Sequence, residues 1–245
     1  QIRFTDGLDL RKPKSLDVVL TLDEVIQFIT ERHLKEQVQK HKANAGMAIV
    51  MNPHTGEIYS LVNVPPYNPN NYSVYAANNW TNSIISSSFE PGSIFKPILA
   101  AAAIDAGKAL PNDVFFCENG AYKIGKVSIG EASGHKFGWL TLSDIITKSS
   151  NIGAIKIGQE LGAPAFYSYM KKFGFGEKLE VDLPGESRGK LRDVSQWSNI
   201  SLASLSFGHE IGGTPLQIVT AISAIANGGN LMRPHITKAI LQDGK

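Results

Sequence analysis

The sequence predicts an α+β fold in which helices pack on an antiparallel sheet. Two apolar, β-rich runs, 47–51 and 57–62, flank a proline- and glycine-containing turn at 52–56, which is the pattern of a β-hairpin. The stretch 94–106 is apolar on all sides and ends at Gly107, as a buried core helix does. The order helix, hairpin, cluster of helices and strand along the chain predicts this arrangement.

The remaining elements follow from apolar periodicity, capping residues and chain breakers. A helix is expected over 21–42, opened by Thr21 and Glu24 as a capping box. Proline at the first helical position supports the helices that begin at Pro164 and Pro215. The other expected segments are a loop over 65–72, loops and short strands over 108–140, a helix over 141–161 interrupted at 149–151, a helix over 164–174, a loop over 178–192, a helix over 214–227 and a strand over 231–241.

Composition and charge exclude several classes of function. The chain has 245 residues, 42% of them hydrophobic, and 24 basic against 22 acidic residues give a net charge of +2. No basic cluster reaches the size of a nucleic-acid footprint, so no nucleic-acid partner is expected. Cys117 is the single cysteine and the six histidines show no ligand-like spacing, so we expect neither a disulfide nor a metal site. No apolar run approaches the ~20 residues that span a bilayer.

The pair Ser93 and Lys96 lies at the start of the apolar segment, directly after Pro91-Gly92. Side chains three residues apart share one face of a helix. Burial disfavours the charged form of a lysine, so we expect a lowered pKa for Lys96. A neutral amine beside a hydroxyl is a base with its nucleophile, and the free N–H groups of a helix N-terminus can hold an oxyanion. The alternative is that Ser93 is a plain helix N-cap.

The Ser-x-x-Lys spacing alone indicates little, because it occurs four times in the chain. The other three pairs are Ser133/Lys136, Ser168/Lys171 and Ser187/Lys190. The first and last of these lie in glycine-containing loops, and the middle one lies where lysines complement the dipole of a helix C-terminus. Only Ser93 and Lys96 combine a glycine-led turn, a helix N-terminus and apolar surroundings.

Residues Ser149-Ser150-Asn151 form the one Ser-x-Asn triplet of the chain, between two apolar helical halves. Serine and asparagine compete for backbone hydrogen bonds, so the triplet could be a simple kink or helix stop. In the functional interpretation, the Ser149 hydroxyl passes a proton and the Asn151 amide grips a substrate carbonyl.

The combination of Ser-x-x-Lys with Ser-x-Asn resembles the signature of penicillin-binding proteins and serine β-lactamases. From about residue 15 to the end, the chain is similar to the transpeptidase domain of class B penicillin-binding proteins, and the region 196–208 looks closest to the division-type (septal) members. The other segments that carry this resemblance are 52–58, 67–70, 89–93, 182–186 and 214–217.

The resemblance implies a penicillin-binding protein/serine β-lactamase-like fold, with an antiparallel sheet flanked by helices and an all-helical subdomain. It implies a peptidoglycan D,D-transpeptidase that crosslinks stem peptides. Ser93 would attack the penultimate D-Ala carbonyl and Lys96 would take its proton. Ser149 would relay a proton to the departing D-Ala, and Asn151 would hold the acyl donor and help to position Lys96. No metal or organic cofactor is needed.

One motif of the family is absent, because no lysine of this chain is followed by Ser-Gly or Thr-Gly. In the family that triplet lies on a later strand, which binds the terminal carboxylate of the substrate. We therefore expect residues 21–245 to be a transpeptidase domain incomplete at its C-terminus. Residues 1–20, polar and then briefly apolar at 18–20, are expected to be an entry segment from a preceding domain. The chain alone is expected to react slowly with a fluorescent penicillin.

The resemblance also implies partners and a location. The partners would be stem peptides ending in D-Ala-D-Ala, β-lactams, a glycosyltransferase and other cell-division proteins. The protein would lie on the periplasmic face of the bacterial inner membrane, held there by an N-terminal anchor outside this chain.

Two alternatives share the Ser-x-x-Lys motif. The first is a non-enzymatic β-lactam sensor, which is acylated once and signals, and the septal-type segments argue against it. The second is a serine β-lactamase, which needs a placed carboxylate to activate water, and no glutamate of this chain stands in a Glu-x-x-Leu-Asn context.

Overall fold

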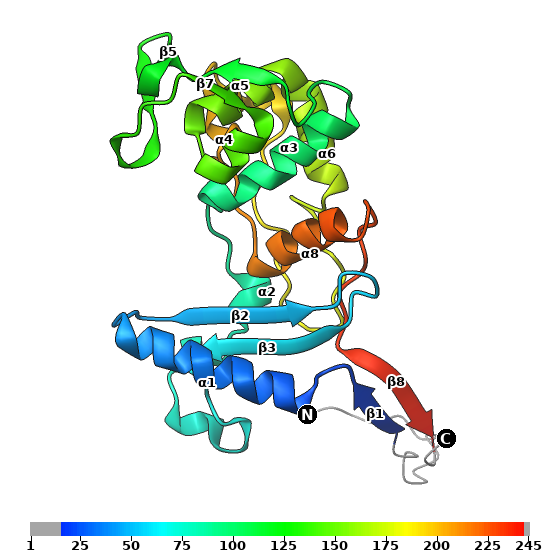
Figure 1. Ribbon diagram of the computed structural model, residues 1–245. Helices are drawn as coiled ribbons and strands as arrows, with labels where there is room; N and C mark the ends of the chain where they lie inside the picture. The colour runs from blue at the N-terminus through cyan, green and yellow to red at the C-terminus, as the bar shows by residue number, and fades with distance from the viewer. Residues whose placement is uncertain (1–15, 243–245) are drawn as a thin grey trace.

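The computed structural model describes residues 16–242 and has a part rich in strands and a part rich in helices, stacked along one long axis (Figure 1). The helices are α1 (Glu24–Lys40), α2 (Ser83–Ser86), α3 (Lys96–Asp105), α4 (Leu142–Lys148), α5 (Asn151–Leu161), α6 (Ala163–Lys172), α7 (Ser201–Ser206) and α8 (Pro215–Ala226). The strands are β1 (Leu16–Leu20), β2 (Gly46–Met51), β3 (Ile58–Val64), β4 (Val114–Phe116), β5 (Ala121–Ile124), β6 (Val127–Gly130), β7 (Trp139–Thr141) and β8 (Thr237–Gln242).

The predicted hairpin is confirmed as the antiparallel pair β2–β3, in which Gly46 lies opposite Val64. Helix α1 packs against this pair, and α2 and α8 also contact it (Figure 1). A buried cluster that includes Ile58 of β3, Ile84 of α2 and Leu216 of α8 joins the layers. The expected fold class, helices flanking an antiparallel sheet, is therefore confirmed.

The predicted capping box at Thr21 is wrong. Helix α1 begins at Glu24, and its N-cap is Asp23, whose Oδ1 accepts a hydrogen bond of 2.9 Å from the Ile26 N–H. Thr21 is buried and donates its hydroxyl to the Ile58 carbonyl at 2.6 Å. The threonine hydroxyl thus ties the segment before α1 to strand β3, and Asp23, a more favoured cap residue than threonine, caps the helix.

The helical part is built around α3, whose Ile98 and Leu99 are buried together with Phe95 just before it. Helices α4, α5, α6 and α8 contact α3, and α5 also packs against α7. Two antiparallel strand pairs, β4–β7 and β5–β6, join this part, so it is not made of helices alone (Figure 1). Apart from Thr141 at the end of β7, they fall within 108–140, where short strands were predicted.

The contact between α5 and α7 depends on Gly158, because a Cβ there would lie 2.1 Å from Ser206 Oγ. Gly158→Ala is therefore expected to lower the free energy of unfolding by about 1–3 kcal/mol, the usual cost of overpacking. Urea unfolding measures this loss. Gly138→Ala is the control, because its Cβ would find Asn119 Oδ1 at an ordinary 3.6 Å. Equal unfolding midpoints for the two variants would contradict the prediction.

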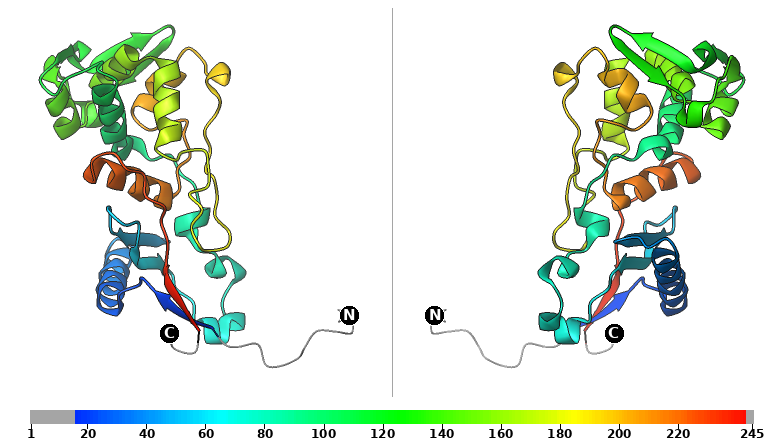
Figure 2. Two further views of the ribbon diagram at one scale, coloured as in Figure 1. Left: turned by 90° about the vertical axis from the view of Figure 1, so that its right-hand side faces the viewer. Right: turned by 90° about the vertical axis from the view of Figure 1, so that its left-hand side faces the viewer.

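Strands β1 and β8 pair antiparallel at the sheet end of the molecule, with Leu16 opposite Gln242 (Figure 2). Residues 16–20 of the expected entry segment are therefore hydrogen-bonded to β8. The rest of the entry segment lies outside the described residues. The strand expected over 231–241 begins later than predicted, because residues 231–236 precede β8 and are not in a strand. None of the helices between residues 16 and 242 has the length and apolar character needed to cross a bilayer.

Candidate active site

The nucleophile candidate lies on a tight turn that leads into α3. Gly92 to Phe95 form a single 3₁₀ turn, and Lys96 is the first residue of α3. Gly92 has a φ of 60°, and its N–H donates to the Gly208 carbonyl at 3.0 Å. A Cβ on Gly208 would lie 2.1 Å from Gly92 O, so only glycine permits this approach. The turn leaves Ser93 exposed while Lys96, at 1% exposure, is buried.

The second part of the site is the link between α4 and α5. Helix α4 ends at Lys148, and its C-cap residue Ser149 adopts the left-handed conformation with φ 56° and ψ 41°. Ser150 is the N-cap of α5, where its Oγ accepts from the Gly153 N–H at 2.9 Å. The predicted helix interruption is confirmed, and this reversal of the chain brings Ser149 and Asn151 to the same lysine.

Four oxygen atoms surround the Lys96 amine. Its Nζ lies 3.1 Å from Ser93 Oγ and 3.0 Å from Ser149 Oγ. It also donates to the Ser149 carbonyl at 2.6 Å and to Asn151 Oδ1 at 2.8 Å. The four residues singled out from the sequence are therefore one hydrogen-bonded cluster centred on this amine.

The chemistry of these oxygens restricts how a neutral Lys96 is oriented. The Ser149 carbonyl and Asn151 Oδ1 can only accept hydrogen bonds, so they take the two N–H groups of a neutral amine. The nitrogen lone pair is then left for a hydroxyl, which can donate to it. Ser93 Oγ, being exposed, is the hydroxyl that an incoming carbonyl can reach. This arrangement can deprotonate Ser93 as it attacks.

Burial lowers the pKa of Lys96 from 10.5 to about 8, against a smaller opposing effect of the Glu131 negative charge. About one tenth of the amine is then neutral at pH 7. A general base works best when its pKa lies near the working pH. Enough of the amine is then neutral to accept a proton, and the amine is still basic enough to take it from a hydroxyl. This is the direction of shift expected from the sequence.

The same shift predicts a stability change with pH. Between pH 8 and 10.5 the unfolded chain holds a proton that folded Lys96 has lost, so stability rises with pH across this window. Compared with Lys96→Met, the parent should gain on the order of 3 kcal/mol from pH 8 to pH 10.5. Denaturant titrations at several pH values measure this difference. A constant difference between parent and variant would show that the pKa is not lowered.

Glu131 is a site residue that the sequence did not reveal. Its carboxylate, 9% exposed, accepts from Ser150 Oγ at 2.5 Å and from the Asn151 N–H at 2.6 Å. The preceding carbonyl, of Gly130, accepts from Asn151 Nδ2 at 3.1 Å. Glu131 stands in a glycine-containing loop 18 residues before Ser149 (149 − 131), and no pattern in the sequence marks it.

The other polar candidates have structural contacts. Glu90 Oε1 accepts from the Glu210 N–H at 2.9 Å, which ties the residues before the Ser93 turn to the chain after α7. The amine of Lys171 pairs with the Glu177 carboxylate, and Ser187 Oγ accepts from the Gly189 N–H at 3.1 Å. Within residues 16–242 no group of three His, Cys, Asp or Glu side chains is placed to hold a metal ion.

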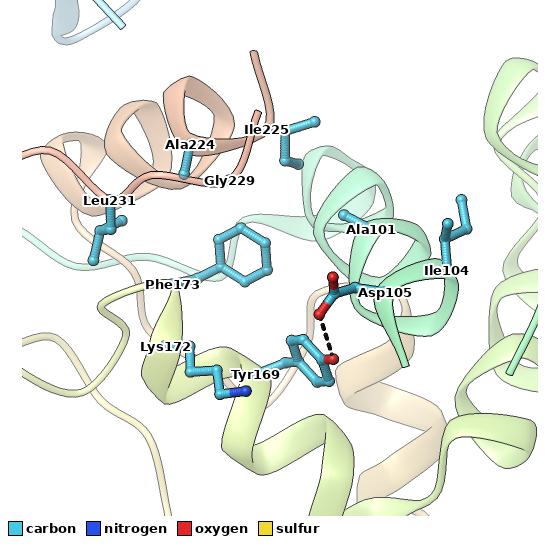
Figure 3. Close-up of a pocket in the computed structure, with 10 residues that line it drawn as sticks. All are labelled: Ala101, Ile104, Asp105, Tyr169, Lys172, Phe173, Ala224, Ile225, Gly229 and Leu231. Carbon is cyan, nitrogen blue, oxygen red and sulfur yellow. Dashed lines mark hydrogen bonds between the residues drawn. The ribbon is translucent and has the colours of Figure 1, made fainter. Parts of the chain in front are cut away.

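A separate apolar cavity of about 460 Å³ lies between α3, α6 and α8 (Figure 3). It is lined by Ile104 and Asp105 at the C-terminal end of α3, the end opposite Lys96. The Tyr169 hydroxyl donates to Asp105 Oδ2 at 2.6 Å, and this bond contributes most to raising the pKa of Tyr169. None of the four oxygen donors and acceptors around the Lys96 amine lines this cavity.

Comparisons with known proteins agree with this geometry. The family model described as the penicillin binding protein transpeptidase domain matches residues 46–245. The probable peptidoglycan D,D-transpeptidase PenA of Neisseria meningitidis is 33% identical over 250 residues, covering 100% of this chain and 42% of that protein. Stage V sporulation protein D of Bacillus subtilis is 35% identical, covering 94% of this chain and 36% of that protein. The chain thus spans well under half the length of these relatives.

Solved structures give the same result. Penicillin binding protein 3 of Mycobacterium tuberculosis, complexed with aztreonam, has a TM-score of 0.86 and 33% sequence identity, over 92% of this chain and 50% of that one. The transpeptidase domain of penicillin-binding protein 3 from Burkholderia pseudomallei has a TM-score of 0.80 and 34% identity, over 92% of this chain and 62% of that one.

Proposed function

This chain belongs to the penicillin-binding protein transpeptidase domain family, in its class B branch, and from that premise we propose that it carries the acyl-transfer site of a peptidoglycan D,D-transpeptidase. The observation that carries the proposal is the convergence of Ser93, Ser149 and Asn151 on the buried amine of Lys96. The substrates are stem peptides ending in D-Ala-D-Ala, as the names of the relatives as peptidoglycan D,D-transpeptidases support.

Acylation begins with the transfer of the Ser93 hydroxyl proton to neutral Lys96. The Ser93 oxygen bonds to the penultimate D-Ala carbonyl carbon, and the peptide bond to the terminal D-Ala breaks. The departing amine takes a proton from the Ser149 hydroxyl, which Lys96 re-protonates over the 3.0 Å contact. The product is an ester on Ser93 and free D-Ala.

Deacylation reverses these proton transfers. The amine of a second stem peptide loses a proton to the Ser149 and Lys96 pair and attacks the ester carbonyl. The ester bond to Ser93 breaks, and the hydroxyl recovers its proton from Lys96. The result is a peptide crosslink between two stems. A β-lactam follows the first half of this sequence when its ring amide takes the place of the D-Ala-D-Ala bond.

Several finer assignments accompany this proposal. Residues 21–245 are assigned to a transpeptidase domain, which the family model matching residues 46–245 supports. The protein works outside the cytoplasm, where its stem-peptide substrates lie. A division role, with a glycosyltransferase and other division proteins as partners, is supported by the segments 196–208 that resemble septal members.

The test is mass spectrometry of the full-length protein after reaction with penicillin. An adduct on the tryptic peptide that contains Ser93 is expected. Release of D-Ala beyond one equivalent per protein only when an amine acceptor is present, together with formation of the crosslinked product, would support transpeptidation. An adduct on another residue, or rapid turnover of penicillin, would contradict the proposal, the latter in favour of a β-lactamase.

A further inference from the structure

Glu131 is a buried carboxylate that the proposed reaction does not use. It follows β6 directly and lies against the first turn of α5. Among the described residues, 16–242, no lysine, arginine or histidine forms an ion pair with it. A buried charge without an ion-pair partner is costly, so its presence needs a compensating arrangement.

That arrangement is the N-terminus of α5. The Ser150 hydroxyl donates to Oε1 at 2.5 Å and the Asn151 N–H donates to Oε2 at 2.6 Å, so each oxygen has its own charge-assisted bond. The positive end of the helix dipole adds to this stabilisation. Both donors belong to the Ser-x-Asn triplet, so the carboxylate fixes where that triplet lies.

The same segment fixes which way the Asn151 amide faces. Gly130 O accepts from Nδ2 at 3.1 Å, which leaves Oδ1 to face Lys96 Nζ at 2.8 Å. A rotation of the amide by half a turn would place an N–H group against the lysine amine and break both contacts. Residues 130 and 131 therefore hold the backbone and the side chain of Asn151 at once.

The charge of Glu131 also acts on Lys96. Its electrostatic effect on the pKa of Lys96 is upward and opposes the larger downward effect of burial. The other charged groups nearby are the Lys156 amine on α5 and the Glu118 carboxylate after β4, which pair with each other at 2.8 Å. The Cys117 thiol lies in the same region, and burial raises its pKa, so it stays neutral as Lys96 titrates.

We propose that Glu131 is a positioning residue for acylation, which aims Asn151 at the Lys96 amine and balances its charge. The proposal rests on the function proposed above for Ser93. Glu131 lies outside the three family motifs. In this proposal it keeps the hydrogen-bond acceptors of the Lys96 amine, the Ser149 carbonyl and Asn151 Oδ1, in place around the general base.

Two conservative variants separate shape from charge in the full-length protein. Glu131→Gln keeps the shape and removes the charge, so the pH at which the acylation rate constant reaches half its plateau should move lower. Glu131→Asp keeps the charge and shortens the reach by one methylene. Its half-plateau pH should match the parent while its plateau falls about 10- to 100-fold, the effect of small misplacement at a reacting centre. Stopped-flow labelling with a fluorescent penicillin from pH 6 to 10 measures both quantities.

Glu118→Gln is the matched control, because Glu118 lies near the same cluster but bonds to Lys156 and not to the triplet. It should retain the parent profile. A merely structural role for Glu131 would lower the thermal unfolding midpoint of its variants and leave their pH profiles unchanged. Folded Glu131→Gln and Glu131→Asp proteins with the parent profile would overturn the proposal.

A double-mutant cycle tests whether Glu131 works through Asn151. In an Asn151→Ala background, Glu131→Asp should change the plateau less than twofold, because groups that act through one another are not additive. Full additivity of the two changes would contradict the mechanism. If the parent protein is not labelled at all, the proposed function itself is wrong and the inference falls with it.

Discussion

Replacing Ser93 by alanine is expected to abolish covalent labelling by penicillin, with a loss of acylation rate of more than about 10³-fold. The loss is expected because Ser93 Oγ is placed to be the nucleophile: it is exposed and lies 3.1 Å from the Lys96 amine. Because the side chain is small and exposed, the variant should keep the parent's unfolding midpoint. Gel fluorescence after incubation with a labelled penicillin, with intact-mass measurement, reads the result.

The chain supplies its own controls for Ser93→Ala. The other three Ser-x-x-Lys pairs provide one control variant each. We expect penicillin to label each of these variants at the parent rate: Ser133→Ala, Ser168→Ala and Ser187→Ala. Ser149 is the informative competitor, because its Oγ is 3.0 Å from the same amine. A penicillin adduct on Ser149 in the Ser93→Ala protein would contradict the assignment. It would show that contact with the Lys96 amine does not by itself identify the attacking hydroxyl.

The acylation rate constant of the parent should rise with pH and level off above about pH 8, because neutral Lys96 is the form that accepts the Ser93 proton. Well below pH 8 the rate should fall about tenfold per pH unit as the amine becomes protonated. Labelling rates at saturating and subsaturating penicillin across pH 6 to 10 give this profile.

The Lys96→Arg variant tests whether the pH dependence of the acylation rate comes from Lys96. Arginine retains the charge but does not lose its proton in the accessible range, so it cannot act as a base. The variant should lose about 10²- to 10⁴-fold in rate and show no rise near pH 8. A Lys96→Arg protein that kept the rise would assign the titration to another group.

The pattern of residues predicted most of the helical part and the core of the site. Pro215 and the Thr214 cap predicted the start of α8, and the structure has both halves of that capping box. The Ser93–Lys96 pair was predicted to lie at the start of a buried helix because local spacing and apolar surroundings are sequence properties. The Ser149–Asn151 interruption was predicted for the same reason.

What the sequence could not predict depends on contacts between distant segments. The role of Glu131 arises because the end of β6 meets the start of α5, and a single acidic residue in a loop carries no sign of that meeting. The N-cap of α1 was misplaced because threonine and aspartate are both common cap residues. The bond from Thr21 to the distant Ile58 carbonyl shows that the threonine hydroxyl is used elsewhere. The left-handed φ of Ser149, at the C-cap of α4, is likewise not marked by its residue type, since glycine and asparagine are the usual residues there.

Because of that left-handed turn, the site requires that Ser149 and Asn151 be separated by one residue. Ser149 reaches Lys96 from the C-cap of α4, and Asn151 reaches it from the first position of α5. Each residue of an α-helix turns its side chain by about 100°, so an asparagine placed one position further into α5 would point its amide to a different side of that helix. The single residue between Ser149 and Asn151 therefore determines the directions in which their two side chains point. Related sequences that differ on either side of the triplet would still have to keep this one-residue separation.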